Sequence, residues 1–269
     1  MVEKQIPLVC PTRGERLLGL IITYDIKPGT RKLLIEEIIK ALYEIEYTDI
    51  KASIYNKRED KAILFLYLTL VKPNIEPEDV IRELKRRVKG INVTYILPQT
   101  PLALIDTIGY PLKSGDIRIF AFDEKAINSA FTEMYRRMGA TALVILFYIG
   151  LYIGKSIVKS YYNTLFGGRV EDVETAFTAF LYLLQALGWG RMEVLKFSDR
   201  EVVVRARDVI GLLARTSGET QTPGSIDPLT RGLIAGILSE ITGRDWRGKE
   251  IDFSIRDGET EVVFKYTLV

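Results

Sequence analysis

The pattern of hydrophobic and polar positions changes period several times within the first hundred residues. Four runs have the apolar or β-branched character of strands: 17–26, 49–56, 62–71 and 91–97. After the first run and again from Pro77 onward, apolar side chains recur at helical spacing on one face. The order β-α-β-β-α-β predicts a ferredoxin-like domain over residues 1–100, with two helices covering one face of an antiparallel sheet.

The second part of the chain combines helical patterns with two hairpins. Helical spacing follows Asp123, which is placed as a cap, and recurs in three further segments: 140–165, 172–187 and 229–242. The two hairpins are 191–207 and 250–268, the second turned by Asp257 and Gly258. We also expect a strand at 117–122, a short helix near 208–215 and a linker at 101–115. Residues 116–269 are then a separate α+β domain.

One apolar run resembles a membrane span in composition. Residues 142–154 carry no charge, but Lys155 and Lys159 interrupt the run before it reaches the roughly 20 residues that a spanning helix needs. We therefore expect no membrane span and a largely buried helix. The first residues lack the apolar core of a signal peptide, so we expect a cytoplasmic protein.

Composition excludes several kinds of chemistry. The 37 Lys and Arg residues against 35 Asp and Glu leave a net charge of +2, which does not indicate direct nucleic-acid binding. The chain has no histidine, which removes Ser-His-Asp and Cys-His catalysis, and Cys10 alone cannot form a disulfide or a multi-thiolate metal site. We expect no metal and no cofactor. Few Asn and Gln among many Lys, Arg, Glu and Ile residues indicate a thermophilic source.

The turn after the first long strand carries a recognisable motif. Asp25, Pro28 and Gly29 stand where the ACT domain has its Asp-x-x-Pro-Gly turn, and residues 17–97 resemble that family in the order of their elements. The resemblance implies that a small effector binds against this turn, where backbone N–H groups and the helix dipole favour a carboxylate. The alternative is a tight turn that binds nothing.

Glycines in the second part resemble a different family, the 4-vinyl-reductase-type domain, whose fold is shared with TRAPP trafficking subunits. The resemblance rests on Gly150 and Gly154, Leu187–Gly190, Gly232 and Gly236, and Gly258 with Phe264. It implies an apolar pocket that binds hydrocarbons or other hydrophobic small molecules. Many members carry two cysteines in the last hairpin. Here those positions are Ser254 and Val262, so a thiol-dependent role is absent.

Aromatic and branched side chains gather on two of the predicted helices. We expect the helices to leave a cleft for an apolar ligand, with Tyr148 or Tyr152 as its polar anchor. The candidate lining residues are Phe147, Tyr148, Leu151, Tyr152, Phe177, Phe180, Leu184 and Trp189. Ordinary core packing is the alternative for each of them.

Two further patterns have simpler interpretations. The Gly-x-x-x-Gly spacings at 150–154 and 232–236 predict close packing between helices. The basic residues in 82–89, at Arg136 with Arg137, and at Arg205 with Arg207 indicate solvated or ion-paired surfaces.

Together these features favour a non-enzymatic, ligand-responsive regulatory protein that binds an apolar small molecule, forms a homodimer and acts in transcription, if at all, through a protein partner. Two alternatives stay open. One is a structural or assembly subunit like the TRAPP relatives, and the other is an accessory protein of tetrapyrrole vinyl reduction.

Overall fold

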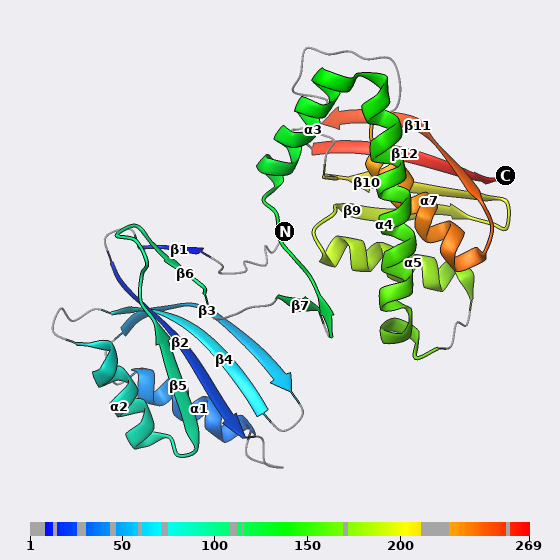
Figure 1. The fold of residues 1–269 in the computed structure, drawn as a ribbon. Helices are drawn as coiled ribbons and strands as arrows, with labels where there is room; N and C mark the ends of the chain where they lie inside the picture. The colour runs from blue at the N-terminus through cyan, green and yellow to red at the C-terminus, as the bar shows by residue number, and fades with distance from the viewer. Residues whose placement is uncertain are drawn as a thin grey trace. The chain divides into compact units, whose positions relative to one another are not determined.

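The computed structural model describes residues 9–12, 15–25, 31–43, 47–58, 61–70, 75–107, 112–114, 116–168, 172–210, 226–256 and 259–269. The chain divides into two compact units, Met1–Leu112 and Lys113–Val269. Both units combine helices with antiparallel strands, which confirms the α+β class (Figure 1).

The first unit is built on a four-stranded antiparallel sheet. Its strands are β2 (Arg16–Asp25), β3 (Tyr47–Arg58), β4 (Lys61–Leu70) and β5 (Ile91–Ile96), in the spatial order β3-β4-β2-β5. The helices are α1 (Arg31–Tyr43), between β2 and β3, and α2 (Pro77–Arg87), between β4 and β5. This order and connectivity are those of the ferredoxin-like arrangement expected from the sequence.

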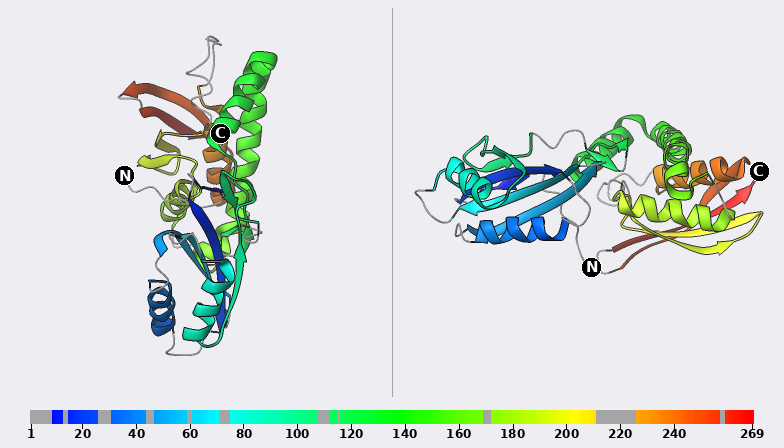
Figure 2. Two further views of the ribbon diagram at one scale, coloured as in Figure 1. Left: turned by 90° about the vertical axis from the view of Figure 1, so that its left-hand side faces the viewer. Right: turned by 90° about the horizontal axis from the view of Figure 1, so that it is seen from below.

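Both helices lie on one face of this sheet (Figure 2). Leu18, Leu20 and Ile22 of β2 pack there in one cluster with Leu42 of α1 and Leu84 of α2. The start of α2 follows its sequence signals, with Pro77 in the first turn and a reciprocal capping box between Glu76 and Asp79.

The opposite face of the first sheet is partly covered by two short strands, β1 (Val9–Pro11) and β6 (Ala103–Ile105), which pair with each other. Leu104 is fully buried against Leu17 and Tyr67, and the Tyr67 hydroxyl donates to Asp106. Residues 103–105 are therefore part of the first unit, although the sequence placed them in a linker. The apolar run 102–105, which follows Pro101, is too short to have a detectable period.

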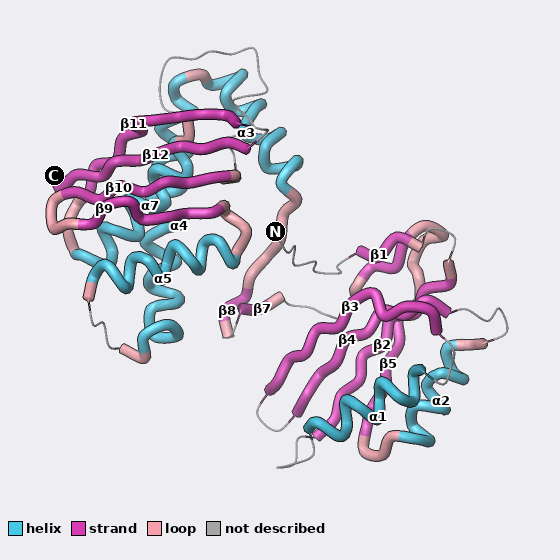
Figure 3. The backbone as a smooth tube through the Cα atoms, turned by 180° about the vertical axis from the view of Figure 1, so that it is seen from behind, coloured by secondary structure: helices cyan, strands magenta, loops and turns pink. Residues whose placement is uncertain are grey.

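The second unit has its own four-stranded antiparallel sheet, in the order β11-β12-β10-β9. The strands are β9 (Arg191–Phe197), β10 (Glu201–Arg207), β11 (Trp246–Arg256) and β12 (Glu259–Leu268), preceded in the chain by the short pair β7 (Lys113–Ser114) and β8 (Ile117–Arg118). The described helices gather on one face of this sheet, and the other face is turned to the viewer in Figure 3.

Four helices complete the second unit: α3 (Glu124–Met138), α4 (Ala140–Phe166), α5 (Val173–Ala186) and α7 (Pro228–Thr242). An aspartate caps α3, α5 and α7 in the same way, because Asp123, Asp172 and Asp227 each accept a hydrogen bond from a backbone N–H three residues later. The main core lies between α4, α5, α7 and the sheet, where Phe177, Phe180 and Phe264 are fully buried.

Helices α4 and α7 touch backbone to backbone. A Cβ on Gly150 would lie 2.1 Å from the Leu229 carbonyl oxygen, and one on Gly154 would lie 2.1 Å from the Leu233 carbonyl oxygen. The reverse holds for Gly232, where a Cβ would lie 2.0 Å from the Phe147 carbonyl oxygen, and for Gly236. The close packing predicted from the two glycine spacings is confirmed. No other residue fits at these four positions without moving a helix.

Ion pairs account for the basic clusters seen in the sequence. Arg205 and Arg207 both reach Glu261 on the neighbouring strand, and Arg136 pairs with Glu133 one helical turn away. Arg86 pairs with Glu83 in the same way. These side chains are interleaved with acids, as expected of a solvated surface, and each exposed pair contributes little to stability.

Helix α4 differs from its prediction in two respects. It was expected to be largely buried, but only 28% of its most apolar 18-residue window is buried. It also runs for 27 residues, so among the described helices it is long and apolar enough to cross a membrane by length and composition. In the second unit, one side of this helix packs on α7 and the other is exposed.

Two smaller expectations also differ. The strand predicted at 117–122 is limited to Ile117–Arg118, and Phe120 and Phe122 are exposed beyond it. Residues 208–210 are not helical, and the remainder of the helix expected at 208–215 lies outside the described residues.

The α4–α7 contact predicts that adding one methyl group at a contact glycine strongly lowers the stability of the fold. Gly150→Ala should lower the free energy of unfolding by about 3 kcal/mol or more, because the new Cβ meets backbone atoms that cannot rotate away. Chemical denaturation of the purified protein measures this. Ser156→Ala, on the exposed side of α4, is the control and should change the value by less than about 0.5 kcal/mol. Equal stabilities for the two variants would contradict the contact.

Candidate functional site

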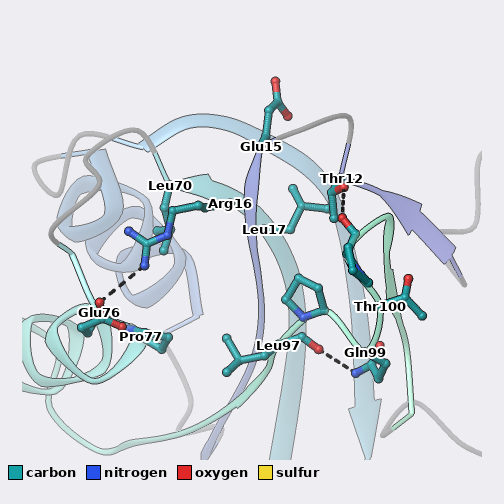
Figure 4. A pocket seen from close by; sticks show the side chains of 12 residues that line it. Thr12, Glu15, Arg16, Leu17, Leu70, Glu76, Pro77, Leu97, Gln99 and Thr100 are labelled. Carbon is teal, nitrogen blue, oxygen red and sulfur yellow. Dashed lines mark hydrogen bonds and ion pairs between the residues drawn. The ribbon is translucent and has the colours of Figure 1, made fainter.

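A pocket of about 540 Å³ lies in the first unit, where the start of β2, the ends of β4 and β5 and the start of α2 come together (Figure 4). Leu17, Leu70 and Leu97 supply apolar surface, and an Arg16–Glu76 ion pair of 3.6 Å stands at one side. The remaining lining residues are Thr12, Glu15, Pro77, Pro98, Gln99, Thr100 and Pro101. The volume is that of a small-molecule site.

The polar groups of this pocket mostly hold its own walls together. The Thr12 hydroxyl donates to the Pro101 carbonyl oxygen at 2.9 Å, and the Gln99 amide donates to the Leu97 carbonyl oxygen at 2.7 Å. The pocket therefore has room for a guest, but these polar side chains are already engaged in fixing the loop after β5.

The effector turn predicted from the sequence is elsewhere. Asp25 is exposed at the end of β2, whereas the pocket is lined by Arg16 and Leu17 at its beginning. A ten-residue strand separates the two ends by roughly 30 Å. Pro28 and Gly29 lie outside the described residues, so effector binding at this turn stays a prediction.

The aromatic set predicted for the second unit separates into two groups. Phe177, Phe180 and Leu184 on α5 are fully buried in the main core, and Leu151 and Trp189 pack against it from its border. These residues do come together, in a position that ordinary core packing also explains.

Tyr148 and Tyr152 do not belong to that interior. They are 51% and 63% exposed on the outer face of α4, with their rings stacked at 6.5 Å from each other. On this geometry neither tyrosine is buried in the interior, and the expectation that one of them anchors a ligand stays a prediction. Phe147 lies next to them in sequence and is half-buried, and the Arg231 guanidinium stands 5.1 Å from its ring centre.

Sequence reasoning missed a polar cluster at the start of α7. Asp227 and Thr230 are 2% and 1% exposed, and the Arg231 side chain lies against Gly248 of β11. The backbone N–H groups of Ile226 and Asp227 donate to the Glu250 carboxylate on β11, at 2.5 and 3.0 Å. The Tyr266 hydroxyl on β12 donates to the Arg231 carbonyl oxygen at 3.2 Å. These bonds tie the beginning of the helix to the sheet.

Three buried atoms of the same turn have no hydrogen-bond partner: Asp227 Oδ2, Thr230 Oγ1 and Arg231 Nε. The other carboxylate oxygen of Asp227 accepts from the Thr230 backbone N–H at 2.9 Å. The Thr230 hydroxyl is near enough to lower the pKa of the Asp227 carboxyl but is not placed to bond it. A signal for this site exists in the sequence, an Asp-x-x-Thr cap, but α5 carries the same motif at an exposed position.

Burial dominates the acidity of Asp227. Loss of water raises the pKa of its carboxyl to about 7, while the hydrogen bond from the Thr230 backbone N–H and the nearby Thr230 hydroxyl lower it. The Glu250 carboxylate adds to the rise, and Arg231 opposes it. Burial also raises the pKa of Tyr266, which therefore stays a neutral phenol in this cluster. Asp227 thus exchanges a proton near neutral pH inside an apolar interior.

In the part of the chain that the structure describes, no group of three or more Cys, Asp or Glu side chains could hold a metal ion. The cluster under α7 offers hydrogen bonds to a small group rather than a reacting pair.

Comparison with known proteins adds no family assignment. No family model and no curated protein matches the chain. Among solved structures, the phenol-responsive sensory domain of the transcription activator PoxR, bound to phenol, has a TM-score of 0.49 at 12% identity, over 58% of this chain and 80% of its own. Trafficking protein particle complex subunit 3 from Naegleria fowleri, bound to palmitic acid, has a TM-score of 0.40 at 14% identity, over 54% and 92%.

A T. tengcongensis H-NOX variant has a TM-score of 0.37 at 12% identity, over 56% of this chain and 77% of its own. All three TM-scores are below 0.5, so the similarities do not establish a shared fold or a shared ligand.

The titration of Asp227 predicts a pH-dependent stability. Its folded pKa of about 7 lies above the usual 3.8 of an aspartate carboxyl, so the group contributes stability below pH 4 that is lost as the pH rises towards 7. Between pH 5 and pH 8 the wild-type free energy of unfolding should fall by up to about 2 kcal/mol more than that of Asp227→Asn. Urea denaturation at both pH values measures this difference.

Asp172 on α5 is the matched control. It is an exposed N-cap whose carboxyl pKa is lowered by the Thr175 hydroxyl and backbone, so its contribution is lost only in acid below pH 4. Asp172→Asn should leave the change in the free energy of unfolding between pH 5 and pH 8 as it is in the wild type. If the free energy of unfolding of Asp227→Asn falls between pH 5 and pH 8 as steeply as that of the wild type, another group is responsible for the pH dependence.

Proposed function

We propose that the chain is a non-enzymatic, ligand-responsive regulatory protein whose second unit binds a small, largely apolar molecule. The observation that carries this proposal is the group of buried polar atoms under the first turn of α7 that lack partners. A buried donor or acceptor without a partner costs about 1–3 kcal/mol, so such atoms are normally paired with protein, water or a bound molecule.

The surroundings of these atoms suit an apolar guest. Leu229, in the same turn, packs in a cluster with Tyr135 and Leu146, and Trp189 borders both this cluster and the main core. The Phe147 ring lies against the Arg231 guanidinium. Sites for small molecules typically combine mostly apolar walls with a few such polar groups.

The α4–α7 contact couples the site under α7 to the exposed surface of α4. If α7 moves, no side-chain rearrangement at Gly150 or Gly236 can compensate, because the two helix backbones are in direct contact there. The two helices therefore move as one body, and the exposed face of α4 moves with the first turn of α7. A partner that reads this face would detect occupancy of the site.

Native mass spectrometry of freshly purified protein tests the proposal. We expect a species heavier than the 30.6 kDa chain by the mass of a small organic compound, which is released on denaturing extraction. The bare mass alone, together with no thermal stabilisation by a panel of hydrocarbons, alcohols and phenols, would contradict it.

A second candidate is an assembly subunit, which the exposed face of α4 favours. Val144, Tyr148, Ile149 and Tyr152 form an uncharged stripe there and are each more than 40% exposed. The stripe carries no charge that a different protein could complement. We therefore propose that it packs against the same stripe of a second copy of this chain, in a two-fold contact.

Analytical ultracentrifugation tests whether the stripe on α4 forms this two-fold contact. The wild type should sediment as a dimer, and a Tyr148→Lys, Tyr152→Lys variant should sediment as a monomer, because two buried charges oppose the contact. Tyr182→Lys, at another exposed tyrosine on α5, is the control and should stay dimeric. A monomeric wild type would rule out the dimer.

A further inference from the structure

The first turns of α5 and α7 carry the same motif in two different states. In α5, the Asp172 carboxylate caps the Thr175 backbone N–H with one oxygen and accepts the Thr175 hydroxyl with the other, at 2.8 and 2.6 Å. In α7, Asp227 caps Thr230 in the same way, but the second oxygen and the hydroxyl do not bond each other. In the exposed motif the Asp and Thr side chains are hydrogen-bonded to each other, whereas in the buried motif they are not.

A third unpartnered atom lies beside this open pair. Residues three and four positions apart share one face of a helix, so Arg231 is on the same side as Asp227. Its Nε is buried without a hydrogen-bond partner, while its side chain is held between the Phe147 ring and Gly248. Donors and an acceptor without partners are thus gathered within a single helical turn.

Charge selects against an ionic guest. A carboxylate or phosphate would meet Asp227 and Glu250. An ammonium group would be attracted by these two carboxyl groups but would face the Arg231 guanidinium and lose its hydration in a region with little water. A neutral group meets none of these penalties. The guest therefore carries no charge at the end that enters this turn.

Hydrogen bonding selects among neutral groups. When Asp227 is ionised its Oδ2 accepts, Arg231 Nε–H donates, and the Thr230 hydroxyl can do either. A hydroxyl group on the guest can donate to Asp227 and at the same time accept from Arg231, with Thr230 completing the set. A pure hydrocarbon would leave all three atoms unpaired.

Resting on the proposed function, we infer that the molecule bound by the second unit carries a hydroxyl group, and that Asp227, Thr230 and Arg231 bind this hydroxyl under the first turn of α7. The apolar remainder of the molecule lies against the neighbouring side chains of Phe147 and Leu229. These polar residues thus take the anchoring role that the sequence suggested for Tyr148 and Tyr152.

Benzyl alcohol and toluene test the inference, because they share a ring and differ by one hydroxyl. In isothermal titration calorimetry on the full chain, benzyl alcohol should bind roughly five- to tenfold more tightly than toluene after correction for its better solubility in water. Thr230→Val should reduce this ratio, and Thr230→Ser, which keeps the hydroxyl, should retain it. Thr175→Val on α5 is the matched control and should leave the ratio unchanged.

The possible results separate the two proposals. Equal corrected affinities for both compounds would overturn the hydroxyl site and leave an apolar pocket standing. A ratio that Thr230→Val and Asp227→Asn both leave unchanged would place the hydroxyl elsewhere and would also overturn the inference. Binding of neither compound would overturn the inference as well. So would a crystal structure in which the Thr230 hydroxyl bonds Asp227, as the Thr175 hydroxyl bonds Asp172 in α5, with only a water at Arg231.

Discussion

The second unit depends on a contact between two helix backbones. Gly150 and Gly154 of α4 face α7, Gly232 and Gly236 of α7 face α4, and no side chain separates them. A contact of this kind has little freedom to adjust, because backbone atoms have no alternative rotamers. It fixes the position of α7 along α4, and so determines which residues of the first turn of α7 lie over the sheet.

That position has a consequence for the polar residues of α7. Asp227 caps the helix, as aspartates cap α3 and α5, but here the cap is pressed against β11 and β12 and excluded from water. Exclusion from water raises the pKa of its carboxyl and leaves neighbouring polar atoms without solvent partners. A common capping motif thereby becomes a site with unused hydrogen-bonding capacity, which is the basis of the function we propose.

Much of the fold could be predicted because local patterns and tertiary packing agree. In β10, Val202, Val204 and Ala206 alternate with outward charged or half-buried residues, and the strand boundaries follow from that alternation. The close helix contact could also be predicted, since a glycine every fourth residue on an apolar helix has few other uses. Short β6 could not, because Leu104 is buried by β1, a strand far away in the sequence.

The site was harder to predict than the fold for a physical reason. Helix α4 is apolar nearly all around its first half, so periodicity does not show that Tyr148 and Tyr152 are exposed while Phe147 is half-buried. The Asp-x-x-Thr motifs of α5 and α7 are equivalent as sequences, and only burial by the sheet distinguishes Asp227 from Asp172. Which polar groups lack partners is therefore decided by tertiary packing.

The most direct measurement is a crystal structure of the protein as purified, at a resolution that separates ordered water from an organic guest. The account predicts non-water density under the first turn of α7, with an oxygen atom within hydrogen-bonding distance of Asp227 and Arg231 and an apolar body beside Phe147. A dry turn in which the Thr230 hydroxyl bonds Asp227, with Arg231 paired to protein or water, would contradict it.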